Sequence, residues 1–114
     1  MTKVLAAAAI CGKLRAQYNG VFDCSGFVKF CYSKAGNNDV PHSSKLIWEN
    51  GEEGDGSAGD IACWAGHVGI CDGQGNVIHS YHDDHRIVIN SIEDVSNWNG
   101  DLLGYRRFDA EDLI

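Results

Sequence analysis

The spacing of apolar residues changes near Gly59, and this change constrains the fold more than any other feature of the chain. Before it, apolar residues recur at helical spacing. After it come short runs of β-type residues separated by turn residues, at 61–64, 67–72, 76–81, 87–92 and 103–108. Helices followed by strands that hairpins connect predict an α+β fold with an antiparallel sheet.

Two main helices are predicted in the first part. Residues 3–16 are rich in Ala, Leu, Lys and Arg, which have high helix propensity, and Asn19-Gly20 closes this segment. A second helix is predicted between an N-cap at Asp23 and a terminator at Gly36. Its predicted buried face consists of Phe27, Val28, Cys31 and Ala35. A short helix over 43–48 and a polar, glycine-rich loop over 51–59 are expected to follow.

Length and charge narrow the class of protein. The 114 residues predict a single domain over 1–114. Nine Lys and Arg residues against 16 Asp and Glu residues give a net charge of -7, which repels nucleic acid and anionic lipid. No stretch approaches the ~20 apolar residues that a transmembrane helix needs, so no membrane insertion is expected. The sequence leaves the oligomeric state open.

The cysteines and the N-terminus suggest synthesis in the cytoplasm. Five cysteines are an odd number, and each lies in an apolar or patterned stretch, so we expect reduced thiols instead of a disulfide framework. Cys31 and Cys71 are expected in the core, whereas Cys11 and Cys63 have no predicted role. The apolar run 4–10 is short for a signal peptide, so neither a secretion signal nor a lipid anchor is expected.

Three residues carry the candidate chemistry. Cys24 is placed in the first turn of the second helix, where backbone N–H groups and the helix dipole favour a thiolate. His67 and His79 fall on the two arms of a predicted hairpin in which Cys71 faces Val77. In that register both imidazoles lie on one face, with Cβ atoms within roughly 7–8 Å. Taken alone, Cys24 is equally well explained as a small buried hydrophobe, and a structural or surface role is the default for each histidine. Together the three residues match a nucleophile, a base and an orienting group.

The same residues resemble the NlpC-type cysteine peptidases, the papain-like peptidoglycan hydrolases of bacteria and phages. Asp23-Cys24-Ser25-Gly26-Phe27-Val28 is similar to their nucleophile motif, and Gly66-His67-Val68-Gly69-Ile70 to their base motif. Val77-Ile78-His79-Ser80 is similar to the motif of the third residue, and Ala58-Gly59-Asp60-Ile61 to the segment before the first core strand. The resemblance extends over roughly Leu5–Phe108.

This resemblance implies a papain-like fold and hydrolysis of amide bonds in peptidoglycan stem peptides, often between D-glutamate and the following diamino acid. It implies that Cys24 attacks as the nucleophile, that His67 is the base and that His79 orients His67. It also implies that Asp23 and Ser25 line the substrate subsite, and that the Cys24 amide stabilises the oxyanion. No cofactor or metal is implied.

Two aromatic residues, Tyr18 and Trp64, each have a functional and a packing interpretation. Family members carry a Tyr well before the nucleophile that assists at the oxyanion site, and the only candidate here is Tyr18, which stands much nearer to Cys24. Tyr18 is therefore either that residue or a packing residue at a helix end. Trp64 precedes His67 by three residues at a strand end and is close enough to shape the mouth of a substrate cleft, although core or rim packing is the default for a tryptophan here.

Alternative functions remain open at this point. His79, His82 and His85 recur every third residue and suggest a metal site, but the spacing alternates faces along a strand, and 81–85 is typical of a solvated turn. An amidase, an acyltransferase or a transglutaminase-like enzyme could use the same triad, and a non-catalytic wall-binding module could use the same fold. The absence of a convincing signal favours a phage lysin, a phage tail enzyme or a delivered effector acting on the bacterial wall.

Overall fold

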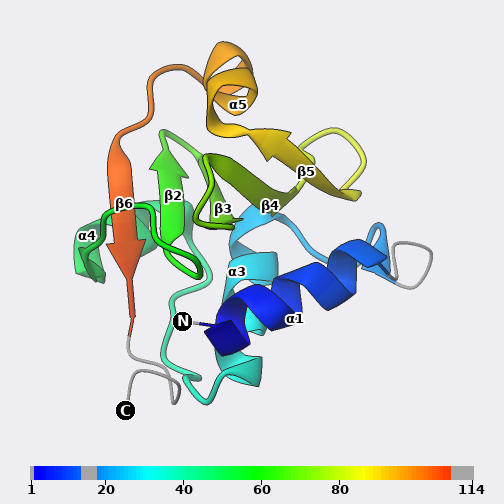
Figure 1. The fold of residues 1–114 in the computed structure, drawn as a ribbon, viewed down its shortest axis with the longest axis vertical. Helices are drawn as coiled ribbons and strands as arrows, with labels where there is room; N and C mark the ends of the chain where they lie inside the picture. The colour runs from blue at the N-terminus through cyan, green and yellow to red at the C-terminus, as the bar shows by residue number, and fades with distance from the viewer. Residues whose placement is uncertain (1, 14–17, 109–114) are drawn as a thin grey trace.

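The structure is a computed structural model that describes residues 2–13 and 18–108. Its helices lie before and after the main run of strands (Figure 1). The helices are α1 (Thr2–Lys13), α3 (Cys24–Lys34), α4 (Ser44–Asn50) and α5 (Ile92–Asn99). The strands are β1 (Glu52–Glu53), β2 (Ile61–Trp64), β3 (His67–Cys71), β4 (Asn76–Ser80), β5 (Ile87–Ser91) and β6 (Gly104–Arg107).

The strands form one antiparallel sheet in the order β1-β6-β2-β3-β4-β5. The consecutive strands β2 to β5 are neighbours, as the predicted hairpins require. β6 departs from this order, because the chain passes through α5 and returns to pair with β2. The predicted α+β class with an antiparallel sheet is confirmed.

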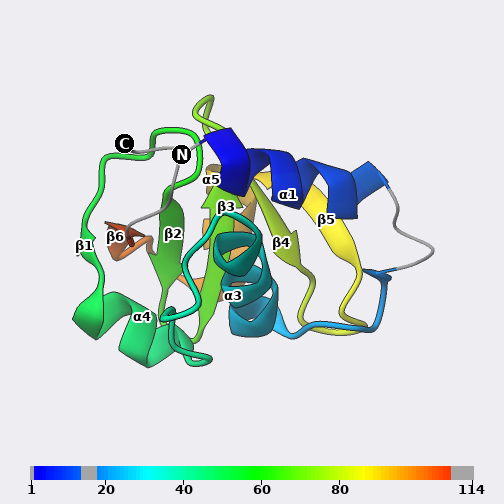
Figure 2. The same cartoon turned by 90° about the horizontal axis from the view of Figure 1, so that it is seen from below.

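Helix α3 begins and ends where its sequence predicts. The Asp23 side chain accepts a hydrogen bond from the Gly26 amide, so Asp23 is the N-cap. The predicted apolar face is buried, with Phe27, Val28 and Cys31 fully shielded from solvent. Figure 2 shows α3 lying across the sheet in front of β3 and β4. The first turn of α3 is thereby held against the strands that carry the two histidines.

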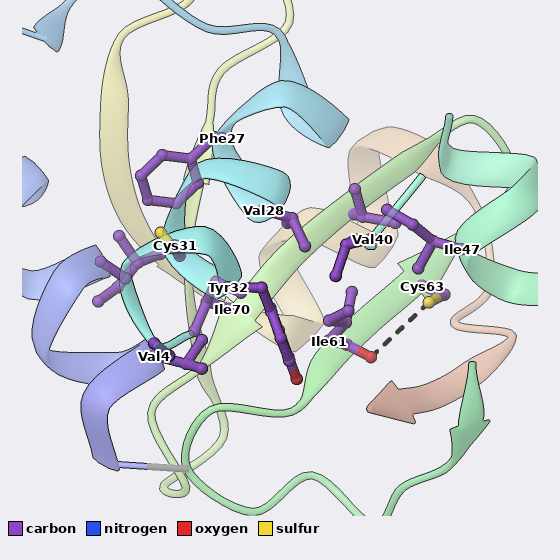
Figure 3. Close-up of a cluster of buried hydrophobic side chains, with 14 of the residues drawn as sticks. Val4, Phe27, Val28, Cys31, Tyr32, Val40, Ile47, Ile61, Cys63 and Ile70 are labelled. Carbon is purple, nitrogen blue, oxygen red and sulfur yellow. Dashed lines mark hydrogen bonds between the residues drawn. The ribbon is translucent and has the colours of Figure 1, made fainter. Parts of the chain in front are cut away.

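The sheet has an apolar cluster on each face, because neighbouring strand residues point to opposite sides. The larger cluster joins the sheet to α1, α3 and α4, and Figure 3 shows its principal side chains around Tyr32 and Ile70. The smaller cluster contains Trp64 and packs against Val95 of α5. Cys24 packs against the larger cluster, whereas Trp64 belongs to the smaller one.

Some predicted boundaries need correction. The first helix is confirmed to Lys13, and residues 14–16 of the prediction lie outside the described residues. The loop predicted over 51–59 contains the short strand β1, and the strand predicted over 103–108 is limited to β6. Helix α5 was not predicted. None of the described helices is long and apolar enough to cross a membrane.

Candidate active site

Cys24 is the first residue of α3 and lies beside the start of β3. Its side chain is partly buried, and its Sγ is 3.9 Å from the carbonyl oxygen of Gly66. The backbone of Val68 also hydrogen-bonds to the sulfur. Gly66 and Val68 flank His67 in the chain, so the Cys24 thiol lies against the backbone that carries His67.

The backbone before α3 is fixed by the end of β4 and the turn that follows. The carbonyl of Phe22 accepts hydrogen bonds from Ser80 Oγ at 2.6 Å and from His85 Nδ1 at 2.9 Å. The Gly20 amide donates to the His85 carbonyl at 3.0 Å. These bonds connect the residues just before Cys24 to β4, the strand that carries His79, and to the turn that follows β4.

The hairpin of β3 and β4 brings His67 and His79 together. Cys71 pairs with Val77, which is the predicted register. His67 Nε2 lies 2.9 Å from His79 Nδ1, and the two rings meet edge to face. Gly69 leaves the necessary space, because a Cβ at this position would lie 3.0 Å from the Cβ of His79. The predicted pairing of the two imidazoles is confirmed.

Asn90 on β5 adds a contact that the sequence analysis missed. His79 Nε2 lies 2.9 Å from Asn90 Oδ1. In the β4–β5 register, Val77 pairs with Asn90 and His79 pairs with Val88, so the Asn90 side chain reaches His79 diagonally across the ladder. The three side chains therefore form a hydrogen-bonded row from His67 through His79 to Asn90.

Burial keeps the two imidazoles neutral. Burial, followed by the charges of His79 and His82, lowers the pKa of His67 from 6.5 to about 4. Burial also lowers the pKa of His79, against the opposing effect of the Asn90 hydrogen bond, and the charge of His82 adds to the decrease. Both rings are consequently uncharged near neutral pH and each can accept one proton.

The electrostatics of Cys24 correct one expectation. Burial raises the pKa of the Cys24 thiol above its ordinary value. The backbone hydrogen bonds of Val68, Ser25 and Cys24 itself oppose this increase, while the charge of Asp23 adds to it. The start of α3 therefore does not lower the thiol pKa as expected, because the desolvation of a half-buried sulfur outweighs the favourable amides.

Asp23 and Ser25 lie on either side of Cys24 at the start of α3. Asp23 Oδ1 accepts the Gly26 amide at 2.7 Å and is 2.8 Å from Nε2 of His42. Partial burial tends to raise the Asp23 pKa, but the hydrogen bonds from His42 and Gly26 and the charges of His42 and His85 lower it overall. Ser25 is buried. Asp23 thus presents an exposed carboxylate beside Cys24.

Trp64 and Tyr18 occupy different surroundings. Trp64 is buried, its Nε1 donates to Ser96 Oγ at 2.9 Å, and its ring centroid is 5.9 Å from that of His67. Tyr18 contacts the rings of Phe22 and Phe30. The structure thus places Trp64 beside His67, whereas the described ring contacts of Tyr18 are those of a packing residue.

The segment 81–85 forms the predicted turn. The His85 amide donates to the Tyr81 carbonyl at 2.8 Å, and His85 has a positive φ of 58°. His82 is exposed and lies 3.0 Å from Asp83. Within residues 2–13 and 18–108, no group of three or more His, Cys, Asp or Glu side chains is arranged to hold a metal ion.

The antiparallel sheet, with the cysteine-bearing helix α3 packed on it, has the papain-like α+β fold. Residues 11–107 match the sequence profile of the NlpC/P60 family. The chain belongs to this family. The search of curated proteins gave no match.

Solved structures support the same fold. A Bacillus cereus protein of the NlpC/P60 family is 25% identical with a TM-score of 0.70, over 91% of this chain and 40% of that chain. A Staphylococcus aureus protein described as similar to a lipoprotein of the NLP/P60 family is 22% identical with a TM-score of 0.67, over 93% and 40% of the two chains. The NlpC/p60 domain of the peptidoglycan hydrolase SagA is 23% identical with a TM-score of 0.67, over 94% and 97%. The chain therefore spans two fifths of the first two proteins and nearly all of the SagA domain.

Proposed function

We propose that this chain is a cysteine peptidase that hydrolyses amide bonds in the peptide stems of peptidoglycan, with the bond after D-glutamate as the expected target. One observation carries the proposal: His67 and His79 are hydrogen-bonded at 2.9 Å beside the backbone against which the Cys24 thiol lies. The match to the NlpC/P60 family and the similarity to the domain of a peptidoglycan hydrolase support the choice of substrate.

In the proposed reaction, Cys24 transfers its proton to His67 as the sulfur attacks the scissile carbonyl. His67 Nε2 is engaged by His79, so Nδ1 is the ring nitrogen left to receive the proton. His67 then returns this proton to the leaving amine, and a thioester links the acyl group to Cys24. Water, deprotonated by His67, cleaves the thioester and releases the carboxylic acid and the free thiol.

The pKa values favour a neutral resting pair. Burial raises the pKa of the Cys24 thiol and lowers that of His67 to about 4, so the thiol keeps its proton until the substrate arrives. Attack and proton transfer then occur together, with His67 acting as a general base. We accordingly expect kcat/KM to rise with pH through a midpoint nearer 4 than 6.5.

The start of α3 supplies the proposed oxyanion donor. The amides in the first turn of a helix have no acceptor within the helix, and they point toward the N-terminal end. The Cys24 amide is in this position, next to its own sulfur. It can donate to the oxygen that becomes negative when the carbonyl carbon turns tetrahedral.

The test is digestion of purified peptidoglycan, one wall with diaminopimelate and one with lysine, with the products identified by mass spectrometry. The wild-type protein is expected to release new stem-peptide fragments, whose masses identify the bond. Cys24→Ala and His67→Ala are expected to abolish release, and His79→Ala to leave a reduced rate. His82→Gln is the matched histidine control, because this side chain is exposed, and it is expected to cleave normally.

Each other outcome has a definite meaning. Fragments that persist with Cys24→Ala would exclude Cys24 as the nucleophile. Binding to the wall without release would favour a non-catalytic module. Release that appears only when an amine acceptor is added, with the acyl group joined to that amine, would identify an acyltransferase.

The proposed place of action is the bacterial cell wall. Residues 1–114 would act there as a single catalytic domain, delivered as a phage lysin, a phage tail enzyme or an effector. Adding the purified domain to intact cells and to isolated walls tests whether the enzyme needs a delivery device to reach its substrate. Lysis of intact cells from outside would argue against a required delivery device, whereas cleavage of isolated walls alone would support one.

A further inference from the structure

We propose that Asn90 is a positioning residue that fixes the proton arrangement of both histidines and so keeps His67 able to accept a proton from Cys24. The inference rests on the proposed function for its kinetic consequence, but the proton arrangement itself can be measured without a substrate. It follows from the two hydrogen-bond contacts of the His79 ring, one to His67 and one to Asn90.

The direction of the hydrogen bonds can be followed from Asn90 inward. The side-chain oxygen of Asn90 can only accept, so Nε2 of His79 must carry the proton in the 2.9 Å contact. A neutral imidazole has one N–H, which leaves Nδ1 of His79 as an acceptor. His67 Nε2 must then donate across its 2.9 Å contact with that nitrogen.

The last step reaches the thiol. Because Nε2 of neutral His67 carries the proton, its Nδ1 has a free electron pair. Nδ1 is the nitrogen that remains for Cys24. A single amide oxygen on β5 thereby determines that the base presents an acceptor to the nucleophile.

The opposite orientation of the Asn90 amide would reverse every bond in the row. An N–H of Asn90 would donate to Nε2 of His79, Nδ1 of His79 would donate to His67, and Nδ1 of His67 would carry the proton. His67 could then take no proton from Cys24 while neutral. Since its pKa is about 4, it is neutral at the pH where bacteria grow, and only the observed orientation supports general base catalysis.

The location of Asn90 suits this role. It lies within the β4–β5 ladder, opposite Val77 and with a further pair on either side, so its backbone is fixed by the sheet. The side chain is partly buried, which strengthens the hydrogen bond relative to one in water. No described contact joins Asn90 directly to Cys24, so it acts through His79.

The decisive measurement is nitrogen-15 NMR of the histidine rings in the full chain at pH 7. Nε2 of both His67 and His79 is expected to be protonated and Nδ1 of both to be bare. Asn90→Asp keeps an acceptor at this position and is expected to preserve the pattern. Asn90→Leu, of similar shape but without an acceptor, is expected to give a mixture of tautomers. The matched control is Asn97→Leu, because Asn97 is an exposed residue of α5.

Kinetics supply the second readout. Asn90→Leu is expected to lower kcat about 10- to 100-fold, the range found for residues that orient a functional imidazole, with KM nearly unchanged. Asn90→Asp is expected to recover most of the loss. A merely structural role would not change the tautomers, because Asp and Leu both keep the branched four-atom outline of the Asn side chain and only Leu lacks the acceptor.

The outcomes separate this inference from the proposed function. A wild-type spectrum with Nδ1 of His79 protonated would overturn the inference, as would unchanged tautomers in folded Asn90→Leu. If Asn90→Leu does not fold, the spectra of the wild-type protein and of Asn90→Asp still show whether Nε2 of both histidines carries the proton. If the tautomers are as expected but no wall is cleaved, the proposed function fails, and a slower alkylation of Cys24 by iodoacetamide in Asn90→Leu still supports the positioning role.

Discussion

Burying His67 as a neutral base has a consequence for stability that can be measured without any substrate. The imidazole is 2% exposed, and its pKa is lowered from 6.5 to about 4. As the pH falls, His67 therefore binds its proton near pH 6.5 in the unfolded chain but only near pH 4 in the folded chain. Between these values the unfolded state holds more protons, so stability falls as the pH falls.

The magnitude follows from the shift. Each pKa unit corresponds to about 1.4 kcal/mol, so a change from 6.5 to about 4 amounts to about 3 kcal/mol. The stability is fully present above pH 6.5, is lost progressively as the pH falls, and changes no further below about pH 4. With a urea m-value of roughly 1.5 kcal/mol/M, the denaturation midpoint should move by roughly 2 M over this interval.

The perturbation is His67→Gln, whose side-chain amide can still donate to His79 but does not titrate. Urea unfolding is followed at pH 7.5 and pH 4.5 for the wild-type protein and the variant, with tryptophan fluorescence as the signal. Subtracting one pH dependence from the other removes the contributions of the carboxylates and of His79. Most of the 3 kcal/mol is expected to disappear from the variant, and equal pH dependence in the two proteins would refute the claim that His67 is buried as a neutral base.

Three further predictions concern single contacts. In the native protein, iodoacetamide is expected to label Cys24 before the three described buried cysteines, which are 0–1% exposed; peptide mapping that finds equal rates would contradict this. Gly69→Ala is expected to lower the free energy of unfolding by about 1–3 kcal/mol and to lower turnover, because the new Cβ would lie 3.0 Å from the Cβ of His79. Normal turnover in this variant would show that the hairpin adjusts to the added methyl group. Arg107→Ala is expected to lower the free energy of unfolding by about 3 kcal/mol, because the fully buried Asp60 loses the 2.7 and 2.9 Å hydrogen bonds that Arg107 donates to it. A melting temperature within about 1 °C of that of the wild type would disprove this.

The main elements of the fold could be predicted because their signals are local. Asp23 caps α3, and the run 61–64 forms β2 with the bounds that its pattern predicts. Helix α5 also had a local signal that was missed, since Ser91 caps it through the Asp94 amide and acidic residues fill its first turn. The pairing of β6 with β2 was not predictable in this way, because it depends on how α5 packs against the sheet.

In the candidate site, too, the features with local signals could be predicted and those that depend on packing could not. The pairing of His67 with His79 was predicted because a short hairpin fixes its own register. The direction of the Cys24 pKa shift was not predicted correctly, because the sequence shows the favourable helix start but not the depth to which the sulfur is buried. Local patterns indicate hydrogen-bond donors near a group, whereas desolvation depends on everything that packs around it.

Asn90 shows why the outermost residue of the row could not be found from the sequence. Its neighbours Ile89 and Ser91 identify a strand, but the turn at 81–86 is too irregular to give the offset between β4 and β5. A shift of one residue would point Asn90 to the other face of the sheet and place Ile89 or Ser91 diagonally across from His79. If Asn90 fixes the proton on His67 as we propose, that proton depends on a register that the turn and the packing of β5 set together. Substitutions far from Cys24 that move this register should then reduce proton acceptance by His67 without changing the surroundings of the thiol.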